Sequence, residues 1–298
     1  MKTVFKSISA VLLALAINGI ITGCGSSLTS DPAPVAACKL KKSVYTASGT
    51  LSTATYTYEG ELLKTQVDVY EYTGSPTVTN TTTYVYNAEG YAMSSTSGSS
   101  AGGTPITSTY NYTSGRLTST GVNVTFEYDT NGNLTRIVGP GGTTTYQGGV
   151  LTGITSSNPY PVNVVQNGRI IKTESSATFR SEYSYDSDGR IAEVRLYSNN
   201  NLSNRQVYEY ESAIPPVIKT KPALKGWPVL PHHFGTVAYA KKVTGYNGAG
   251  VLILTANYVN SFNSRSYPTS TVINSTNSGT NGSGTYTQGT TFEYQDCQ

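Results

Sequence analysis

Aromatic residues recur along the chain in pairs separated by one residue, and a turn-forming stretch follows each pair. The clearest copies are Phe126–Tyr128 before Asp129–Gly132 and Tyr183–Tyr185 before Asp186–Gly189. Side chains alternate between the two faces of a β-strand, so both rings of a pair lie on one face. The aspartate can hydrogen-bond its own backbone, and the glycine supplies the positive φ that a type I turn plus bulge demands. Each copy therefore predicts a β-hairpin.

Degenerate copies of this unit extend over most of the chain. From Tyr112 to Tyr185 they are spaced by about 16 to 20 residues, which indicates a repeat architecture. The sequence therefore predicts an all-β protein: an antiparallel hairpin-repeat sheet that forms a curved open sheet or a partial barrel. We expect one sheet face to be a tyrosine-rich concavity and the other to be rich in threonine and serine. The remaining copies are Tyr56 and Tyr58, Tyr84 and Tyr86, Tyr110 and Tyr112, Tyr146, Val165, Tyr208 and Tyr210, and Phe292 and Tyr294.

The first 23 residues have the pattern of a signal peptide. Lys2 and Lys6 precede an apolar stretch that is too short to span a bilayer comfortably. It ends in Ile21-Thr-Gly-Cys24, which resembles the lipobox of bacterial lipoproteins, where the cysteine is lipidated. We expect residues 1–23 to be the signal peptide, 24–37 a flexible tether and 38–298 the repeat domain. The alternative is an ordinary cleavage site with a chance cysteine.

The resemblance to lipoproteins implies a location in the cell. A lipidated Cys24 would anchor the chain to a membrane of the bacterial cell envelope, because more than one acyl chain makes anchoring stable. Gly25, rather than aspartate, follows the cysteine, which by analogy with enteric sorting favours the outer membrane.

Two further cysteines, Cys38 and Cys297, stand at the two ends of the repeat domain. In an oxidising compartment a disulfide between them is expected. In the entropic description a loop of that length stabilises the fold by about 4–5 kcal/mol. Two unpaired thiols are the alternative.

The repeats themselves resemble a known family. Tyr183–Arg190 and Glu127–Leu134 are similar to YD repeats, the building units of Rhs-type and teneurin-type proteins. The whole layout resembles bacterial lipoproteins of unknown function that carry degenerate YD-like repeats. That resemblance implies a repeat sheet tethered to the envelope, and it implies no particular ligand.

Charge and composition exclude one class of partner. The net charge is +3, but Lys2 and Lys6 belong to the leader, so the rest of the chain is about +1. No basic field for nucleic acid exists at that charge. Tyrosine is abundant, at 24 residues, and only 12% of residues are charged, which is typical of a β-rich extracytoplasmic protein rather than a disordered one.

The repeat pattern breaks between residues 214 and 235. This stretch holds five of the 13 prolines, the only tryptophan, Trp227, and the only histidines, His232 and His233. Proline cannot donate to a strand ladder, so the stretch predicts a long connection or a plug across the sheet. Trp227, His232, His233, Tyr183 and Tyr185 are the candidate ligand-binding residues. The alternative is a crossover that covers an apolar end of the sheet, with Trp227 as its anchor.

No catalytic or cofactor-binding set emerges from the motifs. Gly98–Gly102 matches G-x-S-x-G only formally, because it lies in low-complexity sequence and not between a strand and a helix. Asp186–Gly189 begins like a calcium loop, but a hairpin turn explains it better. The adjacent histidines lack a third metal ligand.

We therefore expect a non-enzymatic envelope protein without a cofactor, which binds or scaffolds a glycan or another envelope protein. Three alternatives stay open: a hydrolase of envelope polymers that uses the loop Trp227–His233, a carrier of an apolar ligand, and a spacer without a ligand.

Overall fold

A computed structural model of the chain describes residues 38–121, 123–211, 224–228, 239–265, 267–278 and 283–296. Within these ranges the chain is all β, as expected, and its 20 strands form one antiparallel sheet. No helix in the described ranges is long and apolar enough to cross a membrane. The strands are β1 (Lys39–Ala47), β2 (Thr50–Glu59), β3 (Leu62–Tyr72), β4 (Val78–Tyr86), β5 (Ala92–Ser99), β6 (Ile106–Thr113), β7 (Arg116–Thr120), β8 (Val124–Tyr128), β9 (Leu134–Gly139), β10 (Gly142–Gln147), β11 (Val150–Ser156), β12 (Val162–Gln166), β13 (Arg169–Glu174), β14 (Phe179–Tyr185), β15 (Ile191–Ser198), β16 (Asn201–Tyr210), β17 (Ala240–Asn247), β18 (Leu252–Phe262), β19 (Pro268–Asn277) and β20 (Gly284–Gln295).

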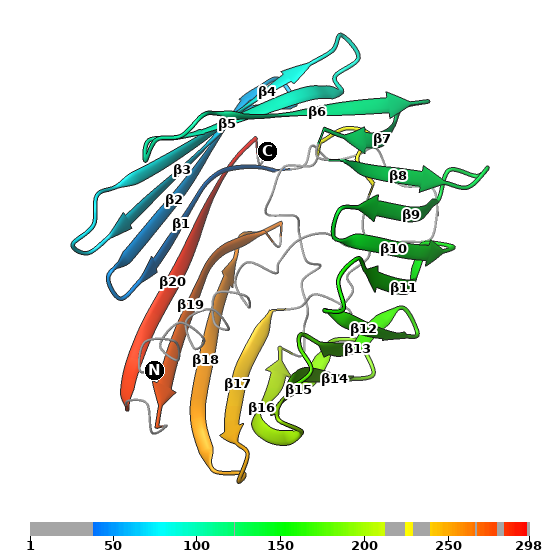
Figure 1. The fold of residues 1–298 in the computed structure, drawn as a ribbon. Coiled ribbons are helices and arrows are strands. Elements are labelled where there is room, and N and C mark those ends of the chain that lie inside the picture. The colour runs from blue at the N-terminus through cyan, green and yellow to red at the C-terminus, as the bar shows by residue number, and fades with distance from the viewer. Residues whose placement is uncertain are drawn as a thin grey trace.

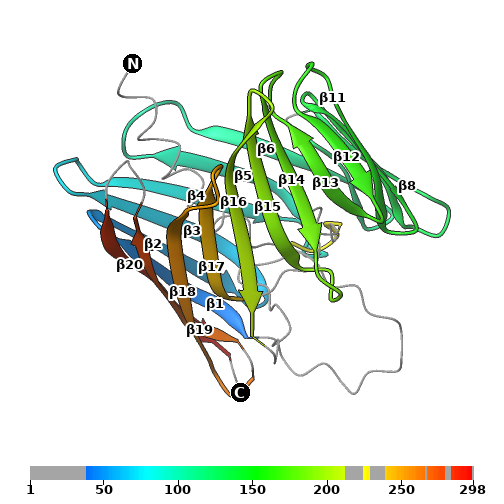
Figure 2. The ribbon, with the colours of Figure 1, turned by 90° about the horizontal axis from the view of Figure 1, so that it is seen from below.

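The sheet curves into a nearly closed, barrel-like ring. Consecutive strands lie side by side, and β1 also pairs antiparallel with β20, with Thr46 opposite Gly289. The first and last strands therefore meet within the sheet and leave no free edge there. Figure 1 shows the sheet turning until β7–β11 stand opposite β17–β20, and Figure 2 shows β14–β16 in front of β3–β6.

The turns between hairpins have the predicted chemistry. In the turn between β8 and β9, the Gly132 amide donates to the Asp129 carbonyl at 2.9 Å, and the Asn133 amide donates to Asp129 Oδ1 at 2.8 Å. Gly132 has a φ of +84°, which favours glycine. The hydrogen bonds from Asn133 lower the pKa of the Asp129 carboxyl. Asp186 and Gly189 make the same turn between β14 and β15, which confirms the hairpin interpretation of that stretch.

A bulge accompanies the second aromatic residue of each pair. The register shifts between Glu127 and Tyr128, and again between Ser184 and Tyr185. A bulge adds a residue to one strand, bends that strand and increases its twist. Recurring bulges at equivalent positions therefore help a long sheet to curl into a ring.

The two faces of the sheet differ as expected. On one face, which we call the tyrosine face, lie the first aromatic residue of each pair and the aliphatic residue after each turn glycine. Tyr56, Tyr110 and Leu117 on this face are buried, with exposed fractions of 4%, 7% and 0%. They belong to small clusters strung along the sheet rather than to one central core.

The opposite face, which we call the threonine face, is largely exposed or half-buried. Five threonines stand opposite one another across β2 to β6, so that their hydroxyls form one row over five strands. A second row crosses β17 to β20. The first row is Thr57, Thr65, Thr83, Thr96 and Thr107, and the second is Thr244, Thr255, Thr276 and Thr285.

Candidate functional site

Tyr185, one of the candidate ligand residues, holds two neighbouring hairpins together. Its hydroxyl donates to the Ile170 carbonyl at 2.5 Å, and the Arg169 guanidinium lies over its ring at 5.4 Å. Burial raises the pKa of its phenol, so the hydroxyl stays a donor. Arg169 and Ile170 directly follow the turn glycine of the preceding hairpin. Tyr185 therefore clamps one repeat to the one before it.

The same clamp recurs around the ring. The Tyr210 hydroxyl donates to the Ile191 carbonyl at 2.7 Å, and Arg190 stacks on the Tyr210 ring at 4.8 Å. Each clamp joins the second tyrosine of a pair to a cation and the carbonyl after it. Two more complete clamps are Tyr58 with Lys39 and Leu40, and Tyr128 with Arg116 and Leu117. The hydroxyls of these tyrosines are thus committed to the fold, which the sequence analysis did not recognise.

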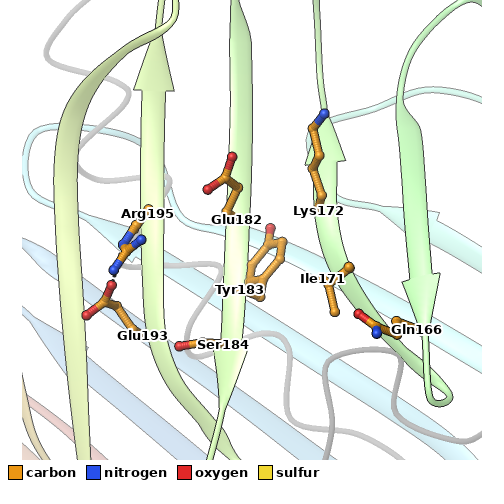
Figure 3. A pocket seen from close by; sticks show the side chains of 8 residues that line it. All are labelled: Gln166, Ile171, Lys172, Glu182, Tyr183, Ser184, Glu193 and Arg195. Carbon is orange, nitrogen blue, oxygen red and sulfur yellow. Dashed lines mark hydrogen bonds and ion pairs between the residues drawn. The ribbon is translucent and has the colours of Figure 1, made fainter.

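Tyr183 packs against a buried cluster that includes Tyr146 and Ile170. It also lines a shallow depression of about 410 Å³, together with Gln166, Ile171, Lys172, Glu182, Ser184, Glu193 and Arg195. Figure 3 shows Lys172, Glu182 and Arg195 on the neighbouring strands β13, β14 and β15, with Tyr183 next to Glu182. Of the candidate ligand-binding residues that the structure describes, Tyr183 lines this depression.

The segment 224–228, yellow in Figure 1, lies beside β7 and away from β16 and β17, the strands before and after it in the chain. Trp227 Nε1 donates to the Tyr112 hydroxyl at 3.0 Å, and the Trp227 ring meets the Tyr110 ring edge-on at 5.3 Å. The Leu117 amide donates to the Gly226 carbonyl at 2.9 Å. These contacts fit the alternative interpretation, in which Trp227 anchors a crossover on an apolar part of the sheet.

The crossover docks on a repeat that departs from the pattern after its turn. After the turn glycine Gly90, Tyr91 and Ala92 stand where an arginine and a leucine or isoleucine follow Gly115, Gly168 and Gly189. Leu224 packs against the cluster that contains Ala92, and the Lys225 ammonium lies 4.5 Å from the centre of the Tyr91 ring. The segment 224–228 thus supplies, from a distant part of the chain, the apolar side chain and the cation that this repeat lacks.

Several predicted residues lie outside the described ranges. These are the lipobox cysteine Cys24, both histidines, His232 and His233, and Cys297. Cys38 is described: it is buried just before β1, where the register places Lys39 opposite Gln295. The predicted disulfide therefore stays a prediction. Among the described residues no group of histidine, cysteine, aspartate or glutamate side chains could hold a metal ion.

The depression near Tyr183 continues into a network of arginines and glutamates on the threonine face. Glu193 accepts hydrogen bonds from Arg195 Nε at 2.5 Å and from Arg205 Nε at 2.7 Å. Burial alone would raise the pKa of the Glu193 carboxyl, but the hydrogen bonds from the two arginines outweigh it and the pKa is lowered. The sequence analysis did not single out these residues, because Arg205 meets Glu193 only through strand pairing.

No family model and no curated protein matches the chain. Among solved structures, a porin-like protein from Bacteroides uniformis ATCC 8492 has a TM-score of 0.42 and 15% identity, covering 86% of this chain and 98% of that one. A porin-like protein from Bacteroides vulgatus ATCC 8482 has a TM-score of 0.31 and 11% identity, covering 87% of this chain and 100% of that one. Similarity at these TM-scores carries neither the fold nor the function of those proteins over to this chain.

Proposed function

We propose that this chain is a lipid-anchored, non-enzymatic protein of the bacterial envelope whose threonine face binds a glycan. The anchoring part of the proposal rests on the lipobox-like Ile21–Cys24. The binding part rests on the exposed hydroxyl row that crosses β2 to β6.

The engagement of the tyrosine hydroxyls within the fold supports the threonine face, rather than the tyrosine face, as the binding surface. Five tyrosine hydroxyls donate to carbonyls of the preceding hairpin, so they are engaged within the fold. The threonine hydroxyls lie at exposed positions on strands that are about 4.7–4.9 Å apart. Within the row, the hydroxyls of Thr57 and Thr65 and those of Thr96 and Thr107 hydrogen-bond to each other. Each hydroxyl can both donate and accept a hydrogen bond, as sugar hydroxyls do. The five tyrosines are Tyr58, Tyr86, Tyr128, Tyr185 and Tyr210.

A glycan array probed with the purified full chain tests the binding part. Any glycan that binds is then tested on a variant with Thr83→Lys and Thr107→Lys, which disrupts the row across β2 to β6. The matched control carries Thr276→Lys and Thr285→Lys, which are equally exposed threonines of the second row. Binding lost only in the first variant supports the proposal. Absence of any bound glycan, or equal binding by both variants, contradicts it.

The anchoring part has a separate test. Expression of the full chain in a bacterium with radiolabelled palmitate should label the protein, and Cys24→Ser should abolish the label and move the protein out of the membrane fraction. An unlabelled wild-type protein would overturn the lipid anchor and leave the binding surface to be judged by the array.

A further inference from the structure

Two arginines face each other on the threonine face, at the edge of the depression near Tyr183. The register of β15 and β16 places Arg195 directly opposite Arg205. Side chains in such a pair have Cβ atoms about 4.5–5.5 Å apart, and like charges placed there repel. Both side chains remain well exposed, at 51% and 42%. A negatively charged group nearby must therefore offset the repulsion between the two guanidiniums.

Glu193 offsets only part of that charge. Its side chain is 14% exposed, and its two carboxylate oxygens are shared between Arg195 and Arg205. Two other cations on this part of the threonine face, on β13 and β14, each pair with a glutamate of their own. Lys172 Nζ lies 2.5 Å from Glu174, and Arg180 Nε lies 3.0 Å from Glu182. Arg195 and Arg205 share the single carboxylate of Glu193. About one positive charge is therefore left uncompensated on this part of the threonine face.

The way in which the arginines hold Glu193 leaves donors for a ligand. Each contact to the carboxylate is made through Nε. A guanidinium has five N–H donors, so the contact through Nε leaves the donors of the two terminal nitrogens. Arg195 uses part of them in a hydrogen bond with the Tyr197 side chain, and the others remain. The planar fork of arginine matches carboxylate, sulfate and phosphate oxygens. Glu193 fixes the two forks side by side, where both can reach one oxyanion.

We propose that Arg195 and Arg205 together bind an oxyanion group, a carboxylate, sulfate or phosphate, carried by an acidic glycan. The proposal goes beyond the proposed glycan site on β2 to β6, because it adds a second site, for a charged ligand, on β15 and β16. Glu193 acts as a positioning residue, since it holds both guanidiniums and does not itself contact the anion. Tyr246 supports the site from β17, because the Arg205 guanidinium lies 5.5 Å from the centre of its ring.

Calorimetric titration of the full chain tests this proposal with three polymers: polygalacturonate, dextran sulfate and uncharged dextran. A fourth titration with inorganic phosphate measures binding of the bare anion. We expect at least one acidic polymer to bind tenfold or more tightly than dextran. Arg195→Gln and Arg205→Gln should each weaken that binding at least tenfold, and Arg195→Lys should weaken it by an intermediate factor because the charge stays but the fork is lost.

Arg136→Gln is the matched control. Arg136 lies on the same face, is 46% exposed and pairs with a single glutamate, Glu127, at 3.2 Å. Its loss should leave the affinity unchanged. If Arg136→Gln weakens binding as much as Arg195→Gln, or if no acidic polymer exceeds dextran, the paired-arginine site is refuted.

The outcome also separates this site from the proposed function. A neutral glycan that binds wild type and both arginine variants equally, but not the Thr83→Lys, Thr107→Lys variant, would sustain the threonine surface and refute the anion site. A far-ultraviolet circular dichroism spectrum identical to that of wild type is required of each variant before its affinity is interpreted.

Discussion

The tyrosine clamp predicts a specific loss of stability when one hydroxyl is removed. Tyr185→Phe keeps the ring, and with it the stacking of Arg169 at 5.4 Å, but deletes the donor to the Ile170 carbonyl at 2.5 Å. A hydrogen bond of this kind contributes about 0.5–1.5 kcal/mol net, and more if the carbonyl is left without a partner. We therefore expect the free energy of unfolding to fall by about 1 kcal/mol.

Thermal or urea unfolding followed by circular dichroism measures this change. For a chain of this size, 1 kcal/mol corresponds to a shift in Tm of roughly 2–4 °C. The sequence analysis placed Tyr185 among candidate ligand residues, so the same variant separates two roles. A clamp residue changes stability, whereas a ligand residue changes binding and leaves unfolding unaffected.

Tyr294→Phe is the control for the hydroxyl itself. The Tyr294 hydroxyl is buried and has no hydrogen-bond partner among the described residues. Its removal should leave stability unchanged or slightly increase it, since a buried polar atom without a partner is costly. If Tyr185→Phe and Tyr294→Phe have the same effect, the clamp contributes nothing and the argument fails.

Three further predictions follow from the same geometry. Gly132→Ala should destabilise the fold by more than Gly250→Ala, although both glycines have a φ near +80°. Only at Gly132 would a Cβ displace the Arg116 guanidinium, which lies over the Tyr128 ring in a clamp, and equal Tm losses would contradict this. If the predicted disulfide forms, intact mass before and after reduction should differ by about 2 Da in wild type but not in Cys297→Ser, because each disulfide lacks two hydrogens. Burial raises the pKa of Tyr146 to about 12, so its contribution to stability is full below the unfolded value near 10 and is lost as pH rises toward 12. The absorbance at 295 nm of wild type minus that of Tyr146→Phe isolates this phenol. The difference should show ionisation delayed until alkaline unfolding, and a difference that titrates near pH 10 would refute that burial.

The local structure of the hairpins could be predicted from the sequence because each turn is determined by residues within the same repeat. Asp129 and Gly132 determine a turn through bonds between residues that are close in the chain. The two-residue period of Phe126 and Tyr128 determines which side chains share a face. These are short-range effects, and every hairpin with a clear motif folded as its residues indicated.

The threonine rows and the paired arginines could not be predicted, because they depend on register between strands. Arg195 and Arg205 are ten residues apart in a hairpin, and a shift of one residue would have placed them on opposite faces. Bulges change the register at many of these hairpins, and no local rule fixes the accumulated result.

The closure of the ring and the docking of Trp227 belong entirely to the tertiary structure. β1 meets β20 only after every intervening strand has contributed its twist and bend. The sequence therefore predicted a curved open sheet or a partial barrel without deciding between them. The unusual composition around Trp227 marked the crossover, but its docking place depended on a small residue, Ala92, in a distant hairpin. The sequence determined the hairpins through contacts between near neighbours, whereas the tertiary structure alone decided which distant surfaces met, because that depends on the summed curvature of the whole sheet.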